Sequence, residues 1–161
     1  MIVVILAGIL IWHASKRDSS AQVHNADSPT YKTISPDGRS INTLGGWRRV
    51  SPPNSQPVYS YDDSIGGVSI SVSQQPLPDS FTSNTSQKIA ELAKGYNAAD
   101  KFITDGTTVY VGTSAKGPQS VIFTKDNLLV LIKSQAVVND QAWKQYVARL
   151  VHSGKDVSPR Y

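Results

Sequence analysis

Residues 101–111 read KFITDGTTVYV, two runs of β-forming residues on either side of Asp105-Gly106. Asp-Gly between such runs is a strong signal for a two-residue hairpin turn, because both turn positions need a positive φ. A second pair of runs follows in SVIFTKDNLLVLI, residues 120–132. Its last part, residues 128–132, is apolar on both faces of a strand, which is typical of the centre of a sheet. These runs predict an antiparallel sheet built from sequential hairpins.

A further hairpin is predicted upstream, between residues 58–61 and residues 68–73. Apolar residues alternate strictly with serines in residues 68–73, so this strand is expected to bury one face and expose the other. Asp62 and Asp63 fall between the two runs, and we interpret them as turn residues; a site for a hard cation or a carboxylate pair is the alternative. Residues 47–50 predict a short first strand or a turn.

Two amphipathic helices accompany the predicted strands. Residues 85–95 follow a capping Asn84 or Thr85 and carry apolar residues every three or four positions. The second helix begins after the N-cap Asn139, and its apolar stripe starts at Trp143. An aromatic stripe of this kind is more often a core face than a ligand site.

The order β-β-α-β-β-β-α predicts an α+β domain over residues 46–151. We expect an antiparallel sheet of about five or six strands with both helices packed on one face. The last helix is predicted to end at residues 152–154, within a loose tail at residues 152–161. Residues 15–45 are rich in Ser, Asp, Asn, Thr, Pro and Gly, and they predict a flexible linker with a short strand near residues 31–34.

Residues 2–12, IVVILAGILIW, are apolar throughout and predict an N-terminal transmembrane helix, with residues 1–14 as an anchor that contacts membrane lipid. At about 1.5 Å per residue this run covers roughly 17 Å, whereas ~30 Å of hydrocarbon takes about 20 residues. The anchor is therefore short or incomplete, and a cleaved signal peptide or a buried core helix are alternatives. The following Lys16-Arg17 favours a cytoplasmic domain, but the polar composition favours the outside, and we expect an extracytoplasmic domain.

Charge and cysteine content narrow the range of functions. The net charge of +4 is spread along the 161 residues, without the basic patch that nucleic-acid binding requires. The chain has no cysteine, which excludes disulfides, thiol catalysis and cysteine-ligated zinc. The three histidines lie outside the predicted core and do not form a Ser-His-Asp site within the domain. We predict neither a cofactor nor a metal site.

Arg48 and Arg49 are the residues that we select as candidate partner contacts, toward anionic headgroups or a partner carboxylate. Two solvated surface arginines are the alternative interpretation. An enzyme would need titratable groups that the fold brings together. The candidates for such a cluster are the aspartates Asp62, Asp63, Asp100 and Asp105.

The element order over residues 46–151, closing with a helix that begins NDQAW at residues 139–143, resembles small extracytoplasmic domains of unknown function. Such domains occur beside membrane segments in bacterial anti-sigma factors, sporulation proteins and envelope lipoproteins. The resemblance implies a tethered α+β domain and carries over no functional residues. We expect a non-enzymatic, membrane-anchored module that binds an envelope protein or polymer. A sensor that signals through the membrane segment is the alternative, followed by a hydrolase.

Overall fold

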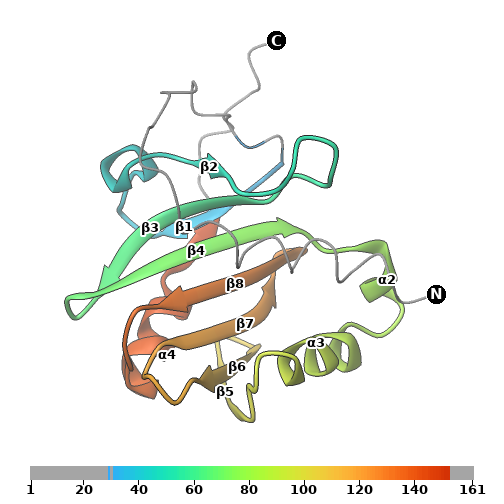
Figure 1. The fold of residues 1–161 in the computed structure, drawn as a ribbon. Coiled ribbons are helices and arrows are strands. Elements are labelled where there is room, and N and C mark those ends of the chain that lie inside the picture. Colours follow the sequence, from blue (N-terminus) through green and yellow to red (C-terminus); the bar gives the residue numbers. More distant parts are fainter. Residues whose placement is uncertain (1–28, 30, 153–161) are drawn as a thin grey trace.

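The central feature of the computed structural model, which describes residue 29 and residues 31–152, is a seven-stranded antiparallel sheet (Figure 1). Its strand order is β2-β3-β4-β8-β7-β6-β5. The strands are β2 (Arg48–Arg49), β3 (Tyr59–Ile65), β4 (Val68–Pro76), β5 (Asp100–Thr104), β6 (Thr107–Thr113), β7 (Gln119–Lys125) and β8 (Leu128–Ser134). Two further strands, β1 (Ile34–Pro36) and β9 (Leu150–His152), form a separate antiparallel pair.

The hairpins at the centre of the sheet confirm the local predictions. Asp105 and Gly106 have φ of 48° and 69°, and Asp126 and Asn127 have φ of 52° and 60°. Positive φ at both turn positions matches the twist of the flanking strands. β8 lies in the middle of the sheet, as its two-sided apolar sequence predicted.

The two long helices pack on opposite faces of the sheet, so the prediction that they share one face is wrong. In α4 (Asp140–Ala148), Trp143 and Val147 belong to the core cluster that contains Phe123 of β7. In α3 (Thr85–Lys94), Ile89 packs in a second cluster with Ile122, the neighbour of Phe123. Because successive strand residues point to opposite faces, apolar β7 and β8 need a helix on each side.

The strand count also exceeds the five or six expected, because even the two-residue β2 joins the sheet. It pairs with β3 through Arg48↔Ser60 and Arg49↔Tyr59. Helix α4 ends at residue 148, earlier than predicted, and the chain continues as β9. Leu150 is fully buried, so the apolar stripe of the helix extends into a strand that packs on the same core.

Residues 31–45, part of the predicted flexible linker, pack against the domain. β1 lies near the predicted short strand and pairs with β9, and the 3-10 helix η2 (Ile41–Leu44) follows it. Ile34 and Ile41 are buried in the main core, at 0% and 8% exposure. Packing against the core therefore extends to at least about fifteen residues before the predicted boundary at residue 46. Isolated apolar residues can be buried in a core even when they follow no helical or strand period.

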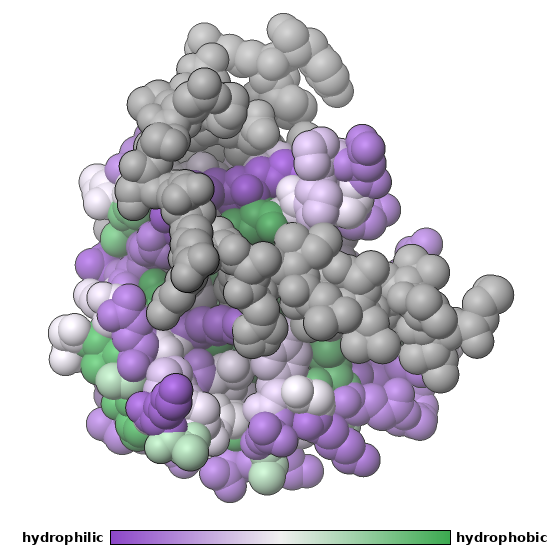
Figure 2. Space-filling view, viewed as in Figure 1, coloured by the Kyte–Doolittle hydropathy of each residue, from purple (hydrophilic) through white to green (hydrophobic). Residues whose placement is uncertain are grey.

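The predicted membrane anchor at residues 2–12, its signal-peptide and core-helix alternatives, and the tail after residue 152 lie outside the described residues. Within residues 31–152, no helix is both long and apolar enough to cross a membrane. On the face seen in Figure 2, hydrophobic residues of the described part lie in small groups separated by hydrophilic ones.

Candidate functional site

A groove of about 460 Å³ lies where the chain after β1, the β3–β4 turn and α4 meet. These three segments are far apart in the sequence. Their lining residues are Pro36 and Arg39; Ser64, Ile65, Gly66 and Val68; and Val137, Val138, Asn139, Ala142, Gln145, Tyr146 and Arg149.

Local backbone chemistry sets each wall of this groove. The β3–β4 turn is formed by Gly66 and Gly67, which have φ of 56° and 83°, values that glycine adopts at little cost. Asn139 caps α4, since its side chain accepts a hydrogen bond from the Ala142 amide at 2.9 Å. The chain after β1 is held by the hydrogen bond from Asp37 N to Arg149 O at 2.8 Å.

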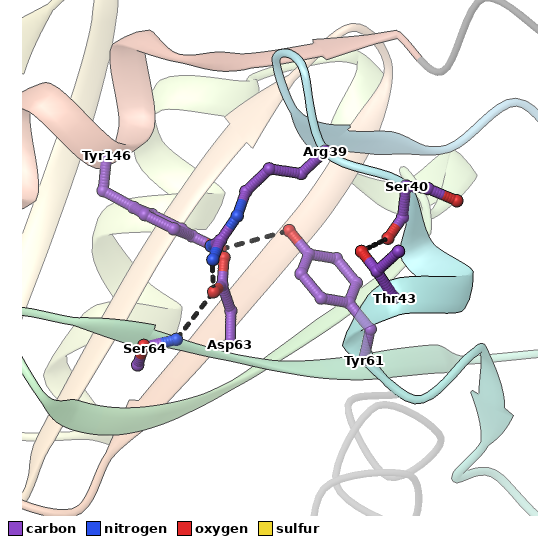
Figure 3. A network of polar contacts seen from close by, with 7 residues as sticks. All are labelled: Arg39, Ser40, Thr43, Tyr61, Asp63, Ser64 and Tyr146. Carbon is purple, nitrogen blue, oxygen red and sulfur yellow. Dashed lines mark hydrogen bonds and ion pairs between the residues drawn. The ribbon is translucent and has the colours of Figure 1, made fainter.

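The buried carboxylate of Asp63 organises the side chains beside the groove (Figure 3). Its side chain is only 1% exposed. Oδ1 accepts hydrogen bonds from the Arg39 guanidinium and from the Ser64 amide, the latter at 2.7 Å. Oδ2 accepts one from the Tyr146 hydroxyl at 3.2 Å, and the Tyr61 hydroxyl lies 3.3 Å from that of Tyr146. A buried charge requires such partners, and in return Asp63 fixes Arg39 and Tyr146 in place.

Both tyrosines of this network keep their protons at neutral pH. Burial raises the pKa of Tyr61 well above its usual value, and the Asp63 charge raises it further. Burial likewise raises the pKa of Tyr146, with Tyr61 and Asp63 adding to the effect. A general acid or base works best when its pKa lies near the operating pH. Tyr146 therefore acts as a fixed hydrogen-bond donor to Asp63, and the Tyr61 hydroxyl supports Tyr146.

The structure does not bring Arg48 and Arg49, the predicted partner contacts, into the groove. Arg48 Nη2 lies 2.6 Å from Asp62 Oδ2 in an exposed ion pair. Arg49 donates hydrogen bonds at 2.9–3.1 Å to the carbonyl oxygens of Pro52, Pro53 and Ser55. Arg49 thus stabilises the loop between β2 and β3. The side chain of Arg48 remains exposed to solvent.

The four candidate aspartates do not form one cluster. Asp62 and Asp63 lie within β3, so their assignment to a turn is wrong; the turn falls at Gly66 and Gly67. As neighbours in a strand they point to opposite faces. Asp100 starts β5 at the far edge of the sheet. Asp105 pairs with Lys125 at 3.0 Å. In the described part of the chain, no three His, Asp or Glu side chains are grouped so that they could hold a metal ion.

Sequence reasoning missed Arg39 and Tyr146 as site residues. Arg39 falls in the predicted linker, where nothing in the sequence distinguishes it. Tyr146 lies three residues after Trp143, on the predicted core stripe of the last helix, and it is only 8% exposed. Asp63 was considered, but its buried partners depend on contacts between residues 24 and 83 positions apart.

A comparison of the chain with protein-family models, curated proteins and solved structures finds no match.

Proposed function

We propose that this chain is a non-enzymatic, membrane-anchored binding or interaction module of the cell envelope, and that its groove is the partner-binding site. The observation that carries the proposal is the fixed Arg39 at the groove. Its guanidinium is held by Asp63, yet its side chain remains 43% exposed. An arginine anchored by a buried carboxylate has lost conformational freedom before binding, which lowers the cost of recognition.

The hydrogen bonds that the Asp63 carboxylate already accepts favour binding over catalysis. Its two oxygens accept three hydrogen bonds from within the domain. A carboxylate that is occupied in this way is poorly placed to take a proton from a substrate. The groove instead offers exposed donors and aliphatic side chains, which suit recognition of a surface.

The membrane and envelope parts of the proposal rest on sequence. The apolar run at residues 2–12 supports a lipid-contacting anchor. The resemblance of the element order to small tethered bacterial domains supports the extracytoplasmic location. The partner in this proposal is an envelope protein or polymer.

A sensor that signals through the membrane segment is the second candidate, and one relationship favours it. Arg39 lies three residues after β1, and Arg149 lies just before β9. The two strands pair with each other, and β1 continues toward the N-terminal segment. A partner in the groove would therefore contact the segment after β1, and β1 is the described strand nearest in sequence to the predicted anchor.

The test is site-specific photo-crosslinking in membranes of cells that make the full chain. A photoreactive amino acid replaces Val137, which lines the groove and is 58% exposed. The matched control replaces Ile103, which is 72% exposed on β5 at the sheet edge. We expect a discrete adduct from position 137 and none from position 103. Equal adducts from both positions, or none from 137, would contradict the proposal.

A further inference from the structure

We infer that the groove binds a peptide segment of the partner through a carboxylate placed between Arg39 and Arg149, with an aliphatic side chain beside it. This inference rests on the proposed function, since it names the ligand chemistry of the same groove. Three observations support it: the charge of the lining, the exposed donors and the apolar wall.

The lining of the groove is cationic. Among the described residues, the lining includes two arginines, Arg39 and Arg149, and no Asp or Glu. Asp63 lies beneath the lining and offsets one of the two positive charges. The one positive charge that is not offset favours an anionic ligand group. Exclusion of water from the concave surface strengthens this preference.

Both arginines retain donors for a ligand. A guanidinium has five N–H donors in a planar fork, and the ion pair of Arg39 with Asp63 is made through Nη1. The Arg149 side chain is exposed and forms no ion pair with another described residue. Forks of this kind match the two oxygens of a carboxylate.

An aliphatic wall stands beside these charges. Val137 is more exposed than most valines of the domain, and Val68, Ile65 and Ala142 line the same groove. A ligand that joins a carboxylate to an aliphatic group would use both features. A peptide bearing Glu, or a free C-terminus, next to Val or Leu has this chemistry.

A peptide suits the site better than a lipid surface does. Anionic membranes attract clusters of roughly four to eight Lys and Arg residues, and this site presents two arginines. Its hollow form also suits a segment that enters it, while a bilayer favours a flat or convex contact. Direct contact with anionic lipid is therefore treated as a competing outcome of the test.

The test uses the full ¹⁵N-labelled chain in phosphatidylcholine nanodiscs, followed by NMR of the arginine Nε–H groups and the Val137 amide. Three acetylated tetrapeptides are titrated: Ala-Glu-Val-Ala amide, Ala-Ala-Val-Ala with a free carboxylate, and neutral Ala-Gln-Val-Ala amide. We expect at least one carboxylate peptide to shift these signals and to bind about tenfold more tightly than the neutral peptide. The two carboxylate peptides distinguish a side-chain from a C-terminal source.

Arg149→Gln should weaken the carboxylate peptide by about tenfold, whereas Arg48→Gln, in the exposed pair with Asp62, should leave it unchanged. The inference is overturned if the neutral peptide binds equally well, if Arg149→Gln has no effect, or if no peptide shifts the groove signals. It is also overturned if only phosphatidylglycerol nanodiscs shift them. If position 137 crosslinks to a partner but the peptides show no preference for a carboxylate, only this inference is contradicted. If position 137 gives no crosslink, the proposed function itself is contradicted.

Discussion

The side chain of Gln74 binds both backbone groups of Ile34. Its Oε1 accepts a hydrogen bond from Ile34 N at 2.8 Å, and its Nε2 donates one to Ile34 O at 2.9 Å. Gln74 is 1% exposed. Because β1 already pairs with β9, this primary amide takes the place of a second neighbouring strand, on the other edge of β1. The contact fastens the first strand of the domain to β4.

Removing this amide should destabilise the domain. In Gln74→Leu, the buried N–H and C=O of Ile34 lose their partners, and each unsatisfied group costs about 1–3 kcal/mol. We expect the free energy of unfolding, measured with urea, to fall by about 2–4 kcal/mol. Gln75→Leu is the matched control, since Gln75 is half-buried on the other face of the strand, and it should change stability little. Equal effects of the two substitutions would show that the amide is not needed.

The packing of β1 and η2 also changes where the stable domain begins. The sequence predicted a domain over residues 46–151. That fragment lacks Ile34 and Ile41, both buried in the main core. Burying two such side chains contributes about 3–6 kcal/mol, so a fragment of residues 31–152 should be more stable than one of residues 46–151 by roughly this amount. Coincident urea midpoints for the two fragments would refute this boundary.

Trp143 is expected to be the most costly single truncation in α4. It is fully buried, and its Nε1 donates a hydrogen bond to Gln119 Oε1 at 3.0 Å. Trp143→Ala should cost about 3–5 kcal/mol, because it opens a cavity and removes a donor. Trp143→Phe keeps most of the volume and should cost less. A loss under about 1 kcal/mol for the alanine variant would mean that this core site relaxes freely.

Stability should decline in alkaline solution. Burial raises the pKa of Tyr61 and Tyr146, so above about pH 10 the unfolded chain loses protons that the native state keeps. The stabilisation is complete below that pH and is lost as the pH rises toward the native pKa values. The expected slope is about 1.4 kcal/mol per pH unit for each tyrosine.

The measurement is urea unfolding between about pH 8 and about pH 11, chosen to bracket tyrosine ionisation in the unfolded chain. Burial lowers the pKa of Lys133, which acts in the opposite direction, so the tyrosine effect must be isolated. The double variant Tyr61→Phe, Tyr146→Phe should show a flatter alkaline decline. An unchanged slope in that variant would assign the decline to other groups.

The proposed extracytoplasmic location can be checked with one introduced thiol. The chain has no cysteine, so Lys116→Cys, in an exposed loop between β6 and β7, supplies a single reporter. A membrane-impermeant maleimide should label it in intact cells as fully as after lysis. Labelling only after lysis would place the domain on the cytoplasmic side.

The turns and helix caps that depend on neighbouring residues could be predicted from the sequence. Asp105-Gly106 forms its turn, and Asn84 and Asn139 cap their helices as expected, because these features depend on neighbouring residues alone. The sequence DDSIGG was assigned one turn too early, since aspartates and glycines both favour turns and only the pairing of Ile65 with Val68 selects the glycines.

Long-range pairing was the unpredictable part. β1 pairs with β9 across more than a hundred residues. Each strand is too short to show the alternation of apolar and polar residues from which strands are predicted. α3 and α4 lie on opposite faces of the sheet because the loops that precede them cross to different faces, and the sequence of a loop does not show which face it reaches. The candidate site could not be predicted for the same reason. Arg39 becomes a candidate binding residue only because the fold brings Asp63 and Tyr146 together beside it.

The pairing of β1 with β9 has a mechanical consequence. Ile34 pairs with His152 and Pro36 pairs with Leu150, so the first residue of β1 and the last residue of β9 lie at the same end of one antiparallel ladder. A force that pulls the two ends apart would load these hydrogen bonds one after another, as in opening a zipper, and not all at once. The ladder alone should therefore open at low force, but the two hydrogen bonds between Gln74 and Ile34 lie at the pulled end and would resist the pull on β1 from the start.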